Sequence, residues 1–147
     1  MILPVTLTVT AACAIINMWL AAGLVRGRLR GKVMIGDGGN PAVQAGMRAH
    51  ANFIEYAPIV LILIALIELA RGPVTWLWVA GVVFVLARLA HPIGMARAAP
   101  NPFRAGGALL TWVVMLALAV WALVIALETP RAVPTTTLVP VVVTPGA

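Results

Sequence analysis

The sequence predicts an all-α integral membrane protein built as a bundle of four helices. Of the 147 residues, 63% are hydrophobic and 10% are charged, and the mean hydropathy is +1.07. A soluble domain is normally about 45–50% apolar with about a quarter of its residues charged, so this chain cannot cover its own surface with polar groups. Four stretches also reach the length of about 20 apolar residues that a membrane-spanning helix needs.

The four expected spans are separated by short polar segments. They are predicted at residues 3–25, 41–70, 73–95 and 104–128. Asn40-Pro41 and Asn101-Pro102 mark the starts of the second and fourth helices, because asparagine caps free N–H groups and proline suits the first helical turn. Residues 1–129 are therefore expected to form the four-helix domain. Residues 130–147, rich in Pro, Thr and Val, are expected to form an extended tail.

The basic residues between the spans are distributed unevenly. Six lie around the loops after the first and third spans and two lie on the other side: Arg26, Arg28, Arg30, Lys32, Arg97 and Arg104 against Arg71 and Arg131. Loops rich in Lys and Arg stay in the cytoplasm, so we expect these two loops to be cytoplasmic and both termini to lie outside. The basic loop is expected to contact anionic membrane lipids, and we expect no nucleic-acid partner.

The most informative polar residues lie within the second span. Arg48, Asn52 and Glu55 are spaced by four and three residues, which places them on one helix face within roughly 60° of arc. Ionisable groups are costly at membrane depth and usually line a site or a cavity. This stripe is therefore the predicted location of function.

A count of residues from the turn between the second and third spans places further polar groups beside this stripe. At equal rise per residue, Glu55 is level with Arg88, and Asn52 is level with His91. An acid and a base at one depth on adjacent helices are expected to pair. The count predicts a polar cavity that reaches from mid-bilayer to the cytoplasmic edge. Its other expected members are Asn17, deep in the bilayer, and Arg48 and Arg104, near the mouth.

This predicted cavity suits a ligand that carries separate carboxylates and an amine. Arginines bind carboxylates bidentately, and a deep glutamate can receive an ammonium group. Two other readings stay open. The polar cluster can instead brace the helices and assemble an oligomer without catalysis. Alternatively, Glu55 can be the ion-coupling carboxylate of a small four-helix transporter, although the first span contains no acid.

The remaining polar and aromatic residues have structural interpretations. Glu68 and Glu128 lie near helix ends and are expected at the membrane interface. The five tryptophans are expected to face lipid or the interface. Cys13 is the only cysteine, so neither an intrachain disulfide nor a cysteine metal cluster is expected, and it is interpreted as a small buried residue.

The motif of the second span resembles a known family. Arg48-x-x-x-Asn52-x-x-Glu55-Tyr56-x-Pro58 is similar to the motif of the MAPEG family, the membrane-associated proteins in eicosanoid and glutathione metabolism. The preceding Gly-Asp-Gly-Gly-Asn-Pro run resembles the small bacterial branch of YecN-like proteins. The resemblance covers residue 1 to residue 128.

The resemblance implies a homotrimer in the bacterial inner membrane, with glutathione as co-substrate between neighbouring subunits. It implies a glutathione transferase or peroxidase that acts on lipophilic electrophiles or lipid peroxides. The glutathione-binding positions it implies are Arg48, Asn52, Glu55, Tyr56 and Arg88, and His91, which the depth count places beside them, is expected to join them. Arg104 resembles the catalytic arginine that stabilises the glutathione thiolate, since a nearby guanidinium favours a thiolate. The chain departs from the leukotriene-forming members, which carry tyrosines where this chain has His91 and Met95.

Overall fold

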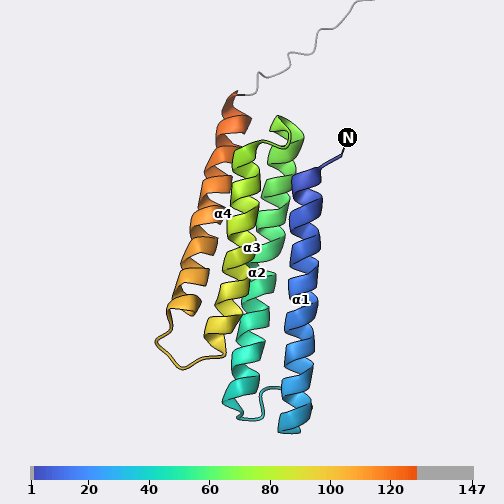
Figure 1. Ribbon diagram of the computed structural model, residues 1–147, viewed down its shortest axis with the longest axis vertical. Helices are drawn as coiled ribbons and strands as arrows, with labels where there is room; N and C mark the ends of the chain where they lie inside the picture. The colour runs from blue at the N-terminus through green and yellow to red at the C-terminus, as the bar shows by residue number, and fades with distance from the viewer. Residues whose placement is uncertain (1, 129–147) are drawn as a thin grey trace, which may run out of the picture.

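The computed structural model describes residues 2–128, which form four helices running side by side in alternating directions (Figure 1). The helices are α1 (Pro4–Gly31), α2 (Pro41–Arg71), α3 (Thr75–Met95) and α4 (Pro102–Glu128). Each is long and apolar enough to cross a membrane. The predicted all-α membrane bundle is therefore confirmed. The expected tail at residues 130–147 lies outside the described residues.

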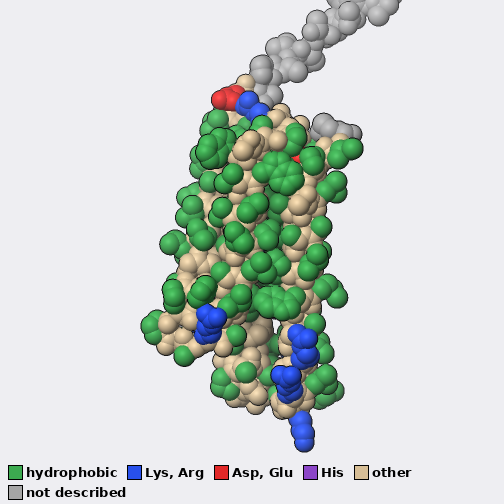
Figure 2. Space-filling model, in the orientation of Figure 1, with side chains coloured by type: hydrophobic (Ala, Val, Ile, Leu, Met, Phe, Trp, Pro, Cys, Tyr) green, Lys and Arg blue, Asp and Glu red, His purple; other side chains and the backbone are tan. Residues whose placement is uncertain are grey.

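The connections place both long loops at one end of the bundle. The α1–α2 and α3–α4 loops lie together, and the short α2–α3 turn lies at the opposite end with the N-terminus (Figure 1). Basic side chains gather at the loop end in Figure 2, while hydrophobic side chains cover the length of the helices between the two ends. We refer to the loop end as the basic end. Its cytoplasmic orientation stays a prediction.

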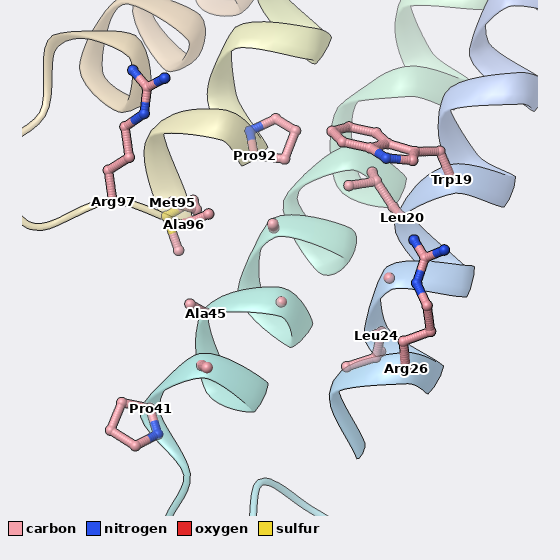
Figure 3. A pocket seen from close by; sticks show the side chains of 14 residues that line it. Trp19, Leu20, Leu24, Arg26, Pro41, Ala45, Pro92, Met95, Ala96 and Arg97 are labelled. Atoms are coloured by element: carbon pink, nitrogen blue, oxygen red, sulfur yellow. The ribbon is translucent and has the colours of Figure 1, made fainter. Parts of the chain in front are cut away.

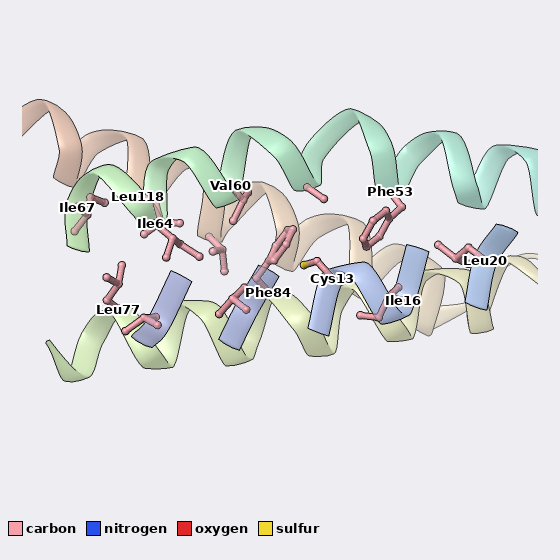
Figure 4. Packing of buried hydrophobic residues seen from close by; sticks show 14 residues of the cluster. Cys13, Ile16, Leu20, Phe53, Val60, Ile64, Ile67, Leu77, Phe84 and Leu118 are labelled. Atoms are coloured by element: carbon pink, nitrogen blue, oxygen red, sulfur yellow. The ribbon is translucent and has the colours of Figure 1, made fainter. Parts of the chain in front are cut away.

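An apolar core holds the helices together along their length. On α1 the buried residues are spaced by three or four positions, as expected for one helix face: Val5, Val9, Cys13, Ile16 and Leu20. They pack against residues of the other three helices (Figure 4). The outward faces of all four helices carry exposed apolar side chains, which is the arrangement that lipid requires.

The first helix is longer than the sequence predicted. It continues past residue 25 to Gly31, so Arg26, Arg28 and Arg30 lie on its last turns and not in a loop. No proline interrupts this segment, and arginine and leucine favour helix. The helix ends where Lys32 adopts a left-handed conformation, with φ of 52°. Cations near a helix C-terminus are favourable, which explains why the basic run continues the helix.

Asparagine side chains cap two helices as predicted. Asn40 Oδ1 accepts hydrogen bonds from the backbone N–H groups of Ala42 at 3.0 Å and Val43 at 3.4 Å. Asn101 Oδ1 accepts from Phe103 N at 3.0 Å. Both caps satisfy N–H groups that have no partner within the helix.

Glu68 lies near the end of α2, as expected, but its side chain is buried within the bundle, and its depth in the membrane stays a prediction. Its side chain is 1% exposed and accepts hydrogen bonds from Val5 N at 2.8 Å, Thr6 N at 2.7 Å and Thr6 Oγ1 at 2.6 Å. The free N–H groups at the start of α1 need acceptors, and this carboxylate supplies them from the end of α2. Glu128, in contrast, is exposed and pairs with Arg71; its interfacial position also stays a prediction.

Candidate functional site

Arg88 lies at the point where α2, α3 and α4 meet. Its side chain is 1% exposed. Nη1 donates to Asn52 Oδ1 at 2.9 Å, and Nη2 donates to the backbone oxygen of Gly107 at 3.0 Å. The guanidinium carbon lies 5.9 Å from the centre of the Tyr56 ring, within the range of a cation–π contact. The structure thus brings together three predicted site residues, namely Arg88, Asn52 and Tyr56.

The predicted ion pair between Glu55 and Arg88 is absent from the protomer. Arg71 and Glu128 form the only ion pair recorded within residues 2–128. The count along the two helices gave equal depth, but it did not give the direction in which each side chain points. Arg88 points into the seam where it meets Asn52, whereas Glu55 is exposed on the outer face of α2. Arg48 is also exposed there.

Close packing of α3 against α4 positions the remaining two site residues. The His91 ring is buried, and its Nδ1 lies 3.1 Å from the backbone oxygen of Arg104. A Cβ added at Gly107 would lie 2.8 Å from the backbone oxygen of Ala87, and one added at Gly94 would overlap the backbone of Arg104. Glycine at these two positions lets the backbones approach. The backbone of Arg104 is therefore held close to α3 at the start of α4, and its side chain is exposed.

A cavity of about 450 Å³ opens beside this contact. It lies between the end of α3, the α3–α4 loop and the first turns of α4, and His91, Asn101 and Arg104 contribute to its lining. Ligand-binding clefts commonly have volumes of about 300–1,000 Å³. The cavity therefore has room for part of a small ligand next to the Arg104 guanidinium.

Asn17 does not join this group. Its Oδ1 lies 2.9 Å from Nε2 of His50, between α1 and α2. Polar pairs of this kind hold membrane helices together. His50 was not singled out from the sequence, although it lies two residues after Arg48 in the same motif. The residues predicted to line one continuous cavity therefore lie in four separate places. These are the Arg88 junction, the outer face of α2 with Arg48 and Glu55, the α3–α4 cavity, and the Asn17–His50 pair.

Comparison with known proteins supplies a family. A model of the MAPEG family matches residues 6–124. The chain is 33% identical over 104 residues to the inner membrane protein YecN of Escherichia coli strain K12, an alignment that covers 70% of this chain and 78% of that protein. The YecN protein of Escherichia coli O6:H1 strain CFT073 gives the same values. Together with the four apolar helices, these matches support an integral membrane location of the bacterial inner-membrane type.

Proposed function

Because this chain belongs to the MAPEG family, we propose that it binds glutathione and either joins it through its sulfur to a lipophilic electrophile or uses its thiol to reduce a lipid peroxide. The proposed site is the outer face of α2 with Arg48, Asn52, Glu55 and Tyr56, extended by the start of α4. We further propose that the protein assembles as a homotrimer, with glutathione held between neighbouring subunits at the basic end.

The observation that supports this proposal is the exposure of Arg48 and Glu55 on a helix that is apolar enough to span the membrane. Neither residue has an ion-pair partner within the described chain. Charged groups that face lipid are costly and normally have partners. A neighbouring subunit would cover this face, and a ligand with carboxylates and an ammonium group would pair with both side chains.

The buried residues support this face in different ways. Arg88 uses both terminal nitrogens within the protomer, so we assign it a positioning role that orients the Asn52 amide. His91 contacts the Arg104 carbonyl and would fix the first turn of α4. Arg104 itself is exposed beside the α3–α4 cavity, where its guanidinium would stabilise a thiolate.

Glutathione supplies a sulfur nucleophile that is weak while protonated. The chain's contribution is to hold the tripeptide by its charged groups and to keep its sulfur deprotonated beside Arg104. In conjugation, a bond forms between sulfur and the electrophilic carbon while the leaving group departs with its electron pair. In peroxide reduction, two glutathione thiols are oxidised to the disulfide, and the peroxide is reduced to an alcohol and water. The hydrophobic substrate would reach the site from the bilayer.

The test is conjugation of glutathione to 1-chloro-2,4-dinitrobenzene, and reduction of cumene hydroperoxide, by the purified protein in lipid vesicles. Arg48→Ala, Glu55→Gln and Arg104→Ala should each lower kcat/KM at least tenfold, which corresponds to about 1.4 kcal/mol. Arg30→Ala removes an exposed arginine from the end of α1 and serves as the matched control, with an unchanged rate expected. If kcat/KM of the three site variants equals that of Arg30→Ala, this face is not the site.

One observation favours a second candidate, a membrane protein that only assembles. The Arg88 bonds join α2, α3 and α4, which is what a structural brace would do. On that reading, Arg48→Ala and Glu55→Gln would weaken the oligomer in detergent. Glutathione would then leave the thermal stability of the unsubstituted protein unchanged.

A further inference from the structure

A second cavity lies on the opposite side of α3 from the α3–α4 cavity. Its volume is about 530 Å³, and it lies between the last turns of α1, the first turns of α2 and the end of α3 (Figure 3). Pro92, Met95 and Ala96 line it from α3, whereas His91 faces α4 through its contact with Arg104. None of the residues proposed to bind glutathione lines this cavity.

The cavity exists because the facing part of α2 carries only small side chains. The residues that α2 contributes after Pro41 are Ala42, Ala45, Gly46 and Ala49. A Cβ added at Gly46 would lie 3.7 Å from Leu24 Cδ1, an ordinary contact, so close packing does not require glycine there. These short alanine and glycine side chains leave a gap between α1 and α3.

The lining of the cavity combines an apolar wall with two cations. Trp19, Leu20 and Leu24 form much of the α1 side, and Trp19 is 44% exposed. Arg26 lies on α1 and Arg97 lies just after α3, and both contribute to the lining. Figure 3 shows them at opposite edges of the cavity, with the Arg97 side chain directed away from Arg26. Within residues 2–128, neither arginine has a carboxylate partner. The Arg97 guanidinium carbon lies 4.9 Å from the centre of the Phe103 ring, on α4.

We propose that this cavity binds an anionic phospholipid of the leaflet at the basic end. The phosphate lies at the mouth of the cavity, where Arg26 and the exposed Arg97 supply positive charge from opposite edges, and the first part of one acyl chain lies along Trp19 and Leu20. Basic pockets between membrane helices bind anionic headgroups in this way. The charge at the mouth and the apolar wall fit the two ends of such a lipid, and a water-soluble anion would leave the apolar wall uncovered.

The charge of the pocket is tested by lipid retention. Full-length protein is reconstituted in equal amounts of phosphatidylglycerol and phosphatidylcholine with identical acyl chains, extracted, and examined by native mass spectrometry. The unsubstituted protein should retain phosphatidylglycerol preferentially. The double variant Arg26→Gln/Arg97→Gln should lower this preference roughly 25-fold, at about fivefold for each basic residue. Arg30→Gln/Lys32→Gln removes the same charge from exposed positions at the same end and should change it less than twofold.

The shape of the pocket is tested by filling it. Gly46→Leu keeps both arginines and places a side chain in the cavity, so it should abolish the retained phosphatidylglycerol. Gly106→Leu is the matched control, because a Cβ there meets no atom within 4 Å and the residue does not line the cavity. Retention of the lipid by Gly46→Leu would overturn the proposal, as would an equal loss in the Arg30→Gln/Lys32→Gln control. Equal retention of both lipids by the unsubstituted protein would overturn it as well.

Discussion

Replacing Glu68 with glutamine is expected to destabilise the bundle more than the same replacement at an exposed glutamate. The carboxylate is 1% exposed and accepts three hydrogen bonds, two from backbone N–H groups and one from the Thr6 hydroxyl. Glutamine keeps one acceptor oxygen but turns an N–H₂ group toward one set of donors. Hydrogen bonds to charged groups contribute about 1.5–3 kcal/mol each. Losing one and weakening the others should cost about 3 kcal/mol, or roughly 10 °C in the unfolding midpoint.

The single cysteine provides the assay. Cys13 is 3% exposed in the core, so a thiol-reactive fluorogenic dye reports its exposure when the bundle unfolds. Glu128→Gln is the matched control at the same end, because that carboxylate is exposed and its pair with Arg71 contributes about 1 kcal/mol or less. If Glu68→Gln and Glu128→Gln unfold at the same temperature, the reasoning about the α1 cap is wrong.

Three further substitutions are expected to change stability in the same assay. Gly107→Ala should force α3 and α4 apart and lower the unfolding midpoint by several degrees, whereas Gly106→Ala has free space and should be neutral or stabilising; similar midpoints would contradict the close packing. Arg88→Lys keeps the charge but cannot bond both partners, and should cost about 2–4 kcal/mol, while Arg30→Ala at the exposed end of α1 should cost under about 0.5 kcal/mol; equal losses would remove Arg88 from the junction. Asn40→Ala should cost about 1 kcal/mol and Asn40→Gly only a few tenths, and a larger loss for glycine would argue against the cap.

The fold could be predicted from the sequence because its main signals are local. Span length, apolar composition and the two Asn-Pro helix starts all depend on neighbouring residues. The end of α1 was placed too early because the basic run was interpreted as a loop. Its arginines favour helix as strongly as the apolar residues before them.

The candidate site was predicted only in part, because side-chain direction depends on tertiary packing. The depth count located Arg88 and Asn52 in one region, and they are bonded to each other. It paired Arg88 with Glu55, since equal height along two helices does not specify which way each side chain points. The Glu68 cap was missed for the same reason. Its donors lie 62 and 63 residues away, and no local pattern indicates that the start of α1 packs beside the end of α2.

The central claim is that the outer face of α2 binds glutathione. Its most direct test is the unfolding midpoint of the detergent-solubilised protein, followed by intrinsic tryptophan fluorescence, with and without 10 mM glutathione or S-methylglutathione, because a ligand that binds only the folded state raises its stability. Both ligands should raise the midpoint of the unsubstituted protein and of Arg30→Ala, and neither should raise that of Arg48→Ala or Glu55→Gln. An unchanged midpoint of the unsubstituted protein, or equal stabilisation of all four proteins, would contradict the claim.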